Sequence, residues 1–158
     1  MPSTSPAGVL LLTLLLCASA GSQTDTWTNH RVEGDRLRDA GRFGEARDAY
    51  AAALEAAEQL GPDGPGVAAI LNSLALLHFM QREYGPAEQY YRHSLDILRR
   101  RFGSAHPEVL TVSSNLAELY RVSNQPEKAA ALYDEWFATA ALARISHTGS
   151  SKKPPTLA

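Results

Sequence analysis

A six-residue block recurs along this chain at intervals of 41 and 42 residues. It reads GRFGEA at 41–46, REYGPA at 82–87 and, in weaker form, NQPEKA at 124–129. A tyrosine follows the last alanine of each block by four residues, and a small residue precedes that alanine by twelve. These residues are Tyr50, Tyr91 and Tyr133, and Gly34, Ala75 and Ala117. A fixed period of this size is typical of proteins built from stacked structural repeats, which favours a binding surface over a catalytic pocket.

Each period reads as two helices joined by a short turn and followed by a Pro/Gly-rich linker. Apolar residues recur at helical spacing, as at Leu71 and Leu74. Gly41 suits the first turn because glycine adopts positive φ without steric cost. Linkers at 61–66 and 103–107 end the first two pairs. The predicted helices are 27–40, 43–60, 67–81, 84–102, 108–122 and 126–145. No segment shows the alternation of a β-strand, so the sequence predicts an all-α fold.

The N-terminal segment predicts export. Residues 1–20 carry no charged side chain, and 9–20 form a leucine-rich apolar run that ends in Ala-Ser-Ala. The run is shorter than the roughly 20 residues that span a bilayer, and its end fits the small-x-small rule for cleavage. We therefore expect a signal peptide at 1–20, a linker at 21–26, and a periplasmic or secreted protein. The alternative is an uncleaved membrane anchor formed by residues 9–20.

The composition excludes several classes of function. The chain has 15 Lys+Arg and 17 Asp+Glu, a net charge of −2, which is no footprint for nucleic acid. Its five histidines have no metal-ligand spacing, and no hydrolase, zinc-protease or phosphate-loop motif occurs. The single cysteine, Cys17, falls in the predicted signal peptide. We expect no catalytic residues, no metal and no cofactor, and hence no enzyme.

The third copy of the repeat carries a family resemblance. Residues 116–120 read LAELY, and Tyr133 stands four residues after Ala129. This resembles the tetratricopeptide repeat, whose pattern pairs Leu-Gly/Ala-x-x-Tyr with a later Ala-x-x-x-Phe/Tyr. The second copy has His78 in place of the first tyrosine, and there we expect a buried histidine. The resemblance extends over 27–145, and the 42-residue period is similar to that of kinesin-light-chain-type repeats.

The resemblance implies a right-handed superhelical array of three antiparallel helix pairs, a tetratricopeptide α-solenoid. The copies would span about 27–66, 67–107 and 108–145, with the repeated tyrosines filling the space between adjacent pairs. A Ser/Lys/Pro-rich tail at 146–158 is expected to be disordered.

Proteins of this kind bind a peptide or a partner protein in a concave groove lined by the first helix of each pair. Helical spacing assigns nine residues to that groove: Arg31, Asp35, Arg38, Asn72, Leu76, Phe79, Ser114, Glu118 and Arg121. An apolar centre with charges on both sides suits an extended peptide with apolar anchors and flanking charges of both signs. The alternatives are that Leu76 and Phe79 belong to the core, and that the charges form an ordinary solvated face.

The third copy departs from the others at one position. Ala53 and Ser94 stand seven residues after their alanines, whereas the equivalent residue is Trp136, followed by Phe137. This pair either covers the end of the stack or forms an exposed apolar patch, which predicts a homo-oligomer. The function that we predict is therefore a non-enzymatic exported adaptor or scaffold. The alternatives are a structural protein that self-associates through Trp136 and Phe137, and an accessory of an envelope-bound enzyme complex.

Overall fold

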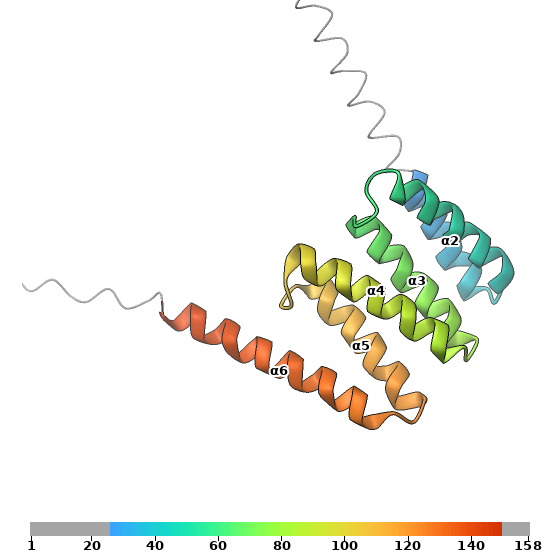
Figure 1. Ribbon diagram of the computed structural model, residues 1–158. Helices are drawn as coiled ribbons and strands as arrows, with labels where there is room; N and C mark the ends of the chain where they lie inside the picture. Colours follow the sequence, from blue (N-terminus) through green and yellow to red (C-terminus); the bar gives the residue numbers. More distant parts are fainter. Residues whose placement is uncertain (1–25, 150–158) are drawn as a thin grey trace, which may run out of the picture. The chain divides into compact units, whose positions relative to one another are not determined.

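The computed structural model describes residues 26–149, which contain six helices and no strand (Figure 1). A first helix covers residues 26–39. It is followed by α2 (Phe43–Glu58), α3 (Pro65–Met80), α4 (Tyr84–Phe102), α5 (Pro107–Val122) and α6 (Pro126–Gly149). The prediction of an all-α protein is confirmed over this part of the chain. None of the described helices is long and apolar enough to cross a bilayer.

The predicted helix ends agree with the observed ones to within two residues, except at the end of α6. This helix continues to Gly149, so the predicted disordered tail is wrong for residues 146–149. Residue 26, predicted to lie in the linker, is already helical. The predicted signal peptide at 1–20, the rest of the linker and residues 150–158 lie outside the described residues.

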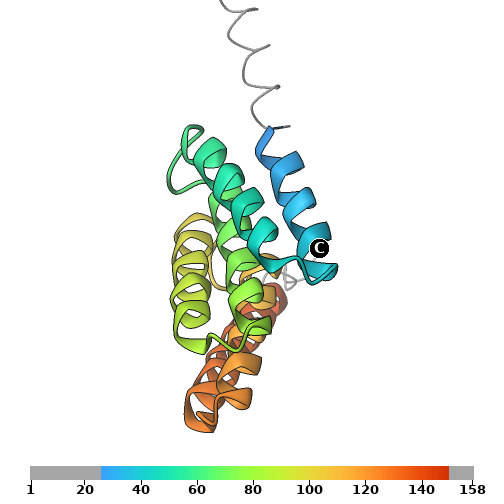
Figure 2. The same cartoon turned by 90° about the vertical axis from the view of Figure 1, so that its right-hand side faces the viewer.

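The chain divides into two compact units, with the boundary between Leu77 and His78 near the end of α3. In the first unit, the helix over 26–39 lies antiparallel beside α2 (Figure 2). The Tyr50 ring of α2 lies against Gly34 and is completely buried. In the second unit, α5 packs against both α4 and α6.

The turns inside the three helix pairs share one backbone geometry. The second residue after each first helix has positive φ: 74° at Gly41, 61° at Arg82 and 60° at Asn124. The next backbone N–H then bonds a carbonyl five residues back, as in a Schellman motif. These bonds run from Arg42 to Leu37, Glu83 to His78 and Gln125 to Tyr120, at 2.9, 2.9 and 2.8 Å. Glycine and asparagine tolerate this conformation, whereas Arg82 adopts it at a cost of about 1–2 kcal/mol.

The repeated small residues lie in the interior of the helix pairs. All six are buried, as expected: Gly34, Ala46, Ala75, Ala87, Ala117 and Ala129. Tyr50 and Tyr91 are also buried, but Tyr133 is 44% exposed, so its predicted packing role is wrong. The reason is that α4 is covered by α5, whereas α6 is the last described helix and no further helix of residues 26–149 follows it.

We predict that Gly34→Ala destabilises the protein. A Cβ at this position would lie 2.6 Å from two atoms of the Tyr50 ring, which is fully buried and has no room to move away. Overpacking of this kind costs about 1–3 kcal/mol. The lower free energy of unfolding would be measured by urea denaturation. Gly44→Ala is the matched control, because a Cβ there meets nothing within 4 Å and the same change should be neutral or slightly stabilising. Equal midpoints for the two variants would contradict the close-contact interpretation.

Candidate functional site

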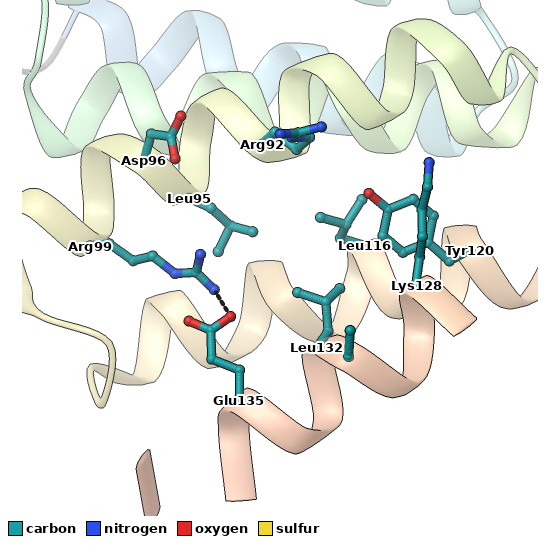
Figure 3. Close-up of a pocket in the computed structure, with 10 residues that line it drawn as sticks. Arg92, Leu95, Asp96, Arg99, Leu116, Tyr120, Lys128, Leu132 and Glu135 are labelled. Atoms are coloured by element: carbon teal, nitrogen blue, oxygen red, sulfur yellow. Dashed lines mark hydrogen bonds and ion pairs between the residues drawn. The ribbon is translucent and has the colours of Figure 1, made fainter. Parts of the chain in front are cut away.

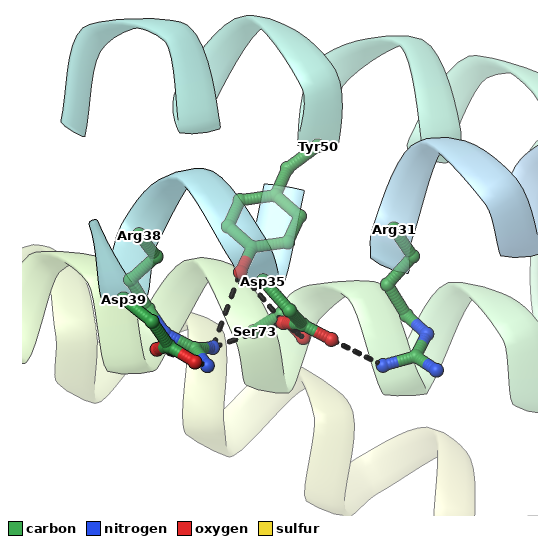
Figure 4. A network of polar contacts seen from close by, with 6 residues as sticks. All are labelled: Arg31, Asp35, Arg38, Asp39, Tyr50 and Ser73. Carbon is green, nitrogen blue, oxygen red and sulfur yellow. Dashed lines mark hydrogen bonds and ion pairs between the residues drawn. The ribbon is translucent and has the colours of Figure 1, made fainter. Parts of the chain in front are cut away.

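The first unit contains a polar network centred on Asp35 (Figure 4). Its carboxylate accepts hydrogen bonds from Arg31 Nη1 at 2.8 Å and from Arg38 Nη1 at 2.9 Å. The Tyr50 hydroxyl donates to it at 2.7 Å, and the Ser73 hydroxyl donates at 3.3 Å. The network therefore joins three helices, the one over 26–39, α2 and α3, through a single carboxylate.

This network contains three of the predicted groove residues, Arg31, Asp35 and Arg38. They are partly buried and paired with one another, so they are not an ordinary solvated face. The Nε atom of Arg31 is buried and has no hydrogen-bond partner among the described residues. A buried donor without an acceptor costs free energy, which the rest of the network has to offset.

Burial raises the pKa of Tyr50 well above its usual value, and the hydrogen bond to the Asp35 carboxylate raises it further. The tyrosine therefore stays neutral and acts as a hydrogen-bond donor to Asp35. No acid–base role follows from this arrangement.

The predicted groove residues of α3 are neither core nor fully exposed. Asn72, Leu76 and Phe79 are half-buried, and the Phe79 ring lies 6.0 Å from the Tyr84 ring. The neighbouring His78 was predicted to be buried, and its side chain is mostly buried, with 14% exposed. Its ring stacks on Tyr90 with centroids 5.4 Å apart.

The predicted groove residues of α5 lie on its more exposed side. Ser114 donates to the carbonyl of Leu110 at 2.9 Å, and Arg121 Nε donates to Glu118 at 2.7 Å. The hydrogen bond from Arg121 lowers the pKa of the Glu118 carboxyl, which keeps the pair charged. The nine predicted residues are thus divided between the two compact units, five in the first and four in the second. A continuous groove across them stays a prediction.

The second unit contains a pocket that the sequence did not predict (Figure 3). It has a volume of about 350 Å³ and lies between α4, α5 and α6. Its walls include Arg92, Asp96 and Arg99 from α4, and Lys128, Leu132 and Glu135 from α6. In both helices these residues are spaced by four and then three, so they follow one helical stripe. That spacing was the signal from which these residues could have been found in the sequence. It falls on the second helix of each pair, whereas the resemblance places the binding groove on the first.

The comparison with protein families decides the identity of the fold. Residues 33–100 and 87–140 match a model of the tetratricopeptide repeat. The chain belongs to the tetratricopeptide repeat (TPR) family. Members of this family are generally non-catalytic scaffolds for protein–protein interaction, and stacked repeats supply the extended surface for that role.

Two solved structures share the TPR fold. The protein BtubC (BKLC) from P. vanneervenii is 22% identical, with a TM-score of 0.68 over 93% of this chain. The TPR domain of Arabidopsis FLU is 20% identical, with a TM-score of 0.64 over 76% of this chain and 98% of that domain. This chain spans 58% of the length of BtubC. A search of curated proteins finds no significant match. The similarity confirms the predicted all-α TPR solenoid.

The aromatic pair of the last TPR helix is exposed. Trp136 is 42% exposed and Phe137 is 62% exposed, with their ring centroids 5.0 Å apart. Trp136 also lines a small cavity with Val109 and Leu132, so it covers part of α5. Phe137 leaves an apolar surface open. Whether the pair covers the end of the stack or forms an interface stays a prediction.

We predict that Tyr120 makes the stability of the protein depend on pH in the alkaline range. Burial raises the pKa of Tyr120 to about 12, helped by the hydrogen bond to Glu88 at 2.9 Å. The contribution of Tyr120 to the free energy of unfolding is complete below the unfolded pKa near 10 and is lost as pH rises to about 12. Tyr120→Phe should therefore lower the free energy of unfolding at pH 8 by about 1–2 kcal/mol and make the alkaline decline shallower.

Urea unfolding at a series of pH values from 8 to about 12 would measure this effect. Tyr133→Phe is the control, because Tyr133 is exposed and its variant should follow the wild type. A Tyr120→Phe variant with the wild-type alkaline decline would show that Tyr120 is not the responsible group.

Proposed function

We propose that this TPR protein is a non-enzymatic exported adaptor that binds an extended peptide or a partner protein in its concave groove. The observation that carries the proposal is the accessibility of apolar side chains on α3. Leu76 and Phe79 are only half-buried, and the next residue, Met80, is 46% exposed. Partly accessible apolar side chains on one helix are suited to anchor the apolar residues of a ligand.

The charged residues of the groove orient a bound ligand, and they contribute less than the apolar residues to the binding affinity. Asp35 holds Arg31 in place, so little side-chain entropy would be lost when a ligand binds. On α5, the Glu118–Arg121 pair presents both signs of charge. Such an arrangement selects a register and suppresses wrong partners.

A second candidate function is self-association through α6. It is supported by the exposure of Phe137 and Trp136, because an exposed apolar patch on a folded protein often marks an interface. The two candidates make opposite predictions for variants in α3 and α6.

We predict that Phe79→Asp abolishes partner capture without changing the oligomeric state, because it places a charge in the apolar centre of the groove. Trp136→Ala should retain capture and, if the protein self-associates, reduce the oligomer.

Residues 21–158 would be used to capture partners from the exported proteome, and sedimentation at high micromolar concentration would give the oligomeric state. Arg47→Glu on the exposed side of α2 is the control. A partner held equally by wild type and Phe79→Asp would move the site away from the groove. A wild type that stays monomeric would remove the second candidate.

Export is the part of the proposal that depends on residues 1–20. We predict that the protein recovered from outside the cytoplasm begins at Gly21, because Ala18 and Ala20 fit the cleavage rule. N-terminal sequencing would identify the first residue. Ala20→Arg should block cleavage, whereas Thr13→Ala should not. A wild type that retains residues 9–20 in the membrane fraction would instead support the anchored alternative.

A further inference from the structure

The pocket between α4, α5 and α6 lies on the opposite side of α5 from the proposed groove. Leu116 and Tyr120 line the pocket. Leu116 lies two positions after the predicted groove residue Ser114, and Tyr120 lies two positions after Glu118. Residues two apart are separated by about 200° around an α-helix. The α5 helix therefore presents two separate faces, of which only one belongs to the groove.

The pocket has an apolar floor. Leu95 and Leu116 are each 2% exposed, and Leu132 of α6 is half-buried beside them. A volume of about 350 Å³ is near the lower end of the range for ligand pockets, about 300–1,000 Å³. This space suits one large apolar side chain with part of its backbone rather than a whole cofactor.

One end of the pocket is closed by a neutralised ion pair. Arg99 Nη2 of α4 donates to Glu135 Oε2 of α6 at 2.9 Å, across the opening (Figure 3). Each of these charges has its partner, so this end does not require a charged ligand, although the buried Nε–H of Arg99 has no hydrogen-bond partner among the described residues.

At the other end of the pocket, two cationic side chains share one carboxylate oxygen. Lys128 Nζ and Arg92 Nη1 lie 3.4 and 3.8 Å from the same oxygen, Glu88 Oε1. That oxygen also accepts the Tyr120 hydroxyl at 2.9 Å. The Arg92 and Lys128 side chains are 69% and 52% exposed, so both have donors left for a second carboxylate.

Asp96 limits the kind of anion that fits. This exposed carboxylate stands on the α4 wall, one turn from Arg92, and forms no hydrogen bond or ion pair with another described residue. It would repel a ligand with several negative charges and would accept a donor from a peptide. The charges therefore favour one carboxylate beside an apolar group.

We propose that this pocket is a second binding site, for a short segment of a partner protein. A large apolar side chain of the segment enters between Leu95 and Leu132, and a neighbouring Asp or Glu side chain pairs with Arg92 and Lys128. The proposal rests on the proposed interaction function but not on the concave groove. With one site on each face of α5, the adaptor holds two partners at once.

A display library of random 12-residue peptides, selected on residues 21–158, provides the probe. Enriched peptides are labelled with fluorescein, and their dissociation constants are measured by fluorescence anisotropy. The expected peptides carry Asp or Glu beside a large apolar residue.

Binding should be at least about tenfold weaker for Arg92→Glu/Lys128→Glu, the size of one lost charge-assisted hydrogen bond. Replacement of the acidic residue of the peptide by its amide should weaken binding similarly. Arg47→Glu, which makes the same change at an exposed position of α2, should bind as the wild type.

The same peptides are tested on Phe79→Asp, so that the two sites are told apart. Peptides lost on Phe79→Asp but retained on Arg92→Glu/Lys128→Glu would support the groove and overturn the pocket proposal. Peptides that bind only through a free C-terminal carboxylate, shown by loss on amidation of that terminus, would also overturn it. Failure to enrich any peptide sensitive to Arg92→Glu/Lys128→Glu would have the same meaning.

Peptides lost on the pocket variant and retained on Phe79→Asp would establish the second site, whatever the outcome for the groove. Circular dichroism checks that the exposed substitutions leave the helices intact.

Discussion

The close approach of Gly34 to the Tyr50 ring is the contact on which the first unit depends. Because Gly34 has no side chain, the Tyr50 ring can lie directly against the helix over 26–39, where it is completely buried. Its hydroxyl then reaches Asp35, and Asp35 in turn holds Arg31, Arg38 and Ser73. A small residue thus allows the packing, the packing places a buried hydroxyl, and the hydroxyl organises the charges of the proposed groove. Loss of the close contact would disturb all of these features together.

The second unit uses a tyrosine in a different way. Tyr120 of α5 reaches Glu88 of α4, and Lys128 of α6 lies over the Tyr120 ring at 5.0 Å from its centroid. The three helices are therefore linked at one end of the pocket, while Arg99 and Glu135 link α4 and α6 at the other. Between these two links the walls are apolar and leave open space. The same polar contacts that stabilise the helix packing create the charged ends of a candidate binding site.

The sequence predicted the helices well because each has strong local signals. Gly41 and the linker glycines end helices, and Pro126 begins one, since these residues restrict or free the backbone directly. The burial of Tyr133 was predicted wrongly. Burial depends on which neighbouring helix covers a residue, and α6 has no further helix of the described chain over Tyr133. The pocket was missed for a related reason. Its walls come from α4 and α6, and the 42-residue period shows that these helices hold equivalent places in their repeats, not that their side chains are neighbours.

The sequence by itself determined the TPR family, the order of the helices and the small residues that are buried in them, because all of these are expressed as a fixed spacing along the chain. It also selected the residues of the proposed groove, since helical periodicity assigns side chains to faces. Only the tertiary structure decided that Tyr50 and Ser73 both reach Asp35, and that Tyr120 and Lys128 both reach Glu88. Pairing depends on the distance between side chains of different helices. That distance is set by the packing of whole helices, which no local pattern specifies.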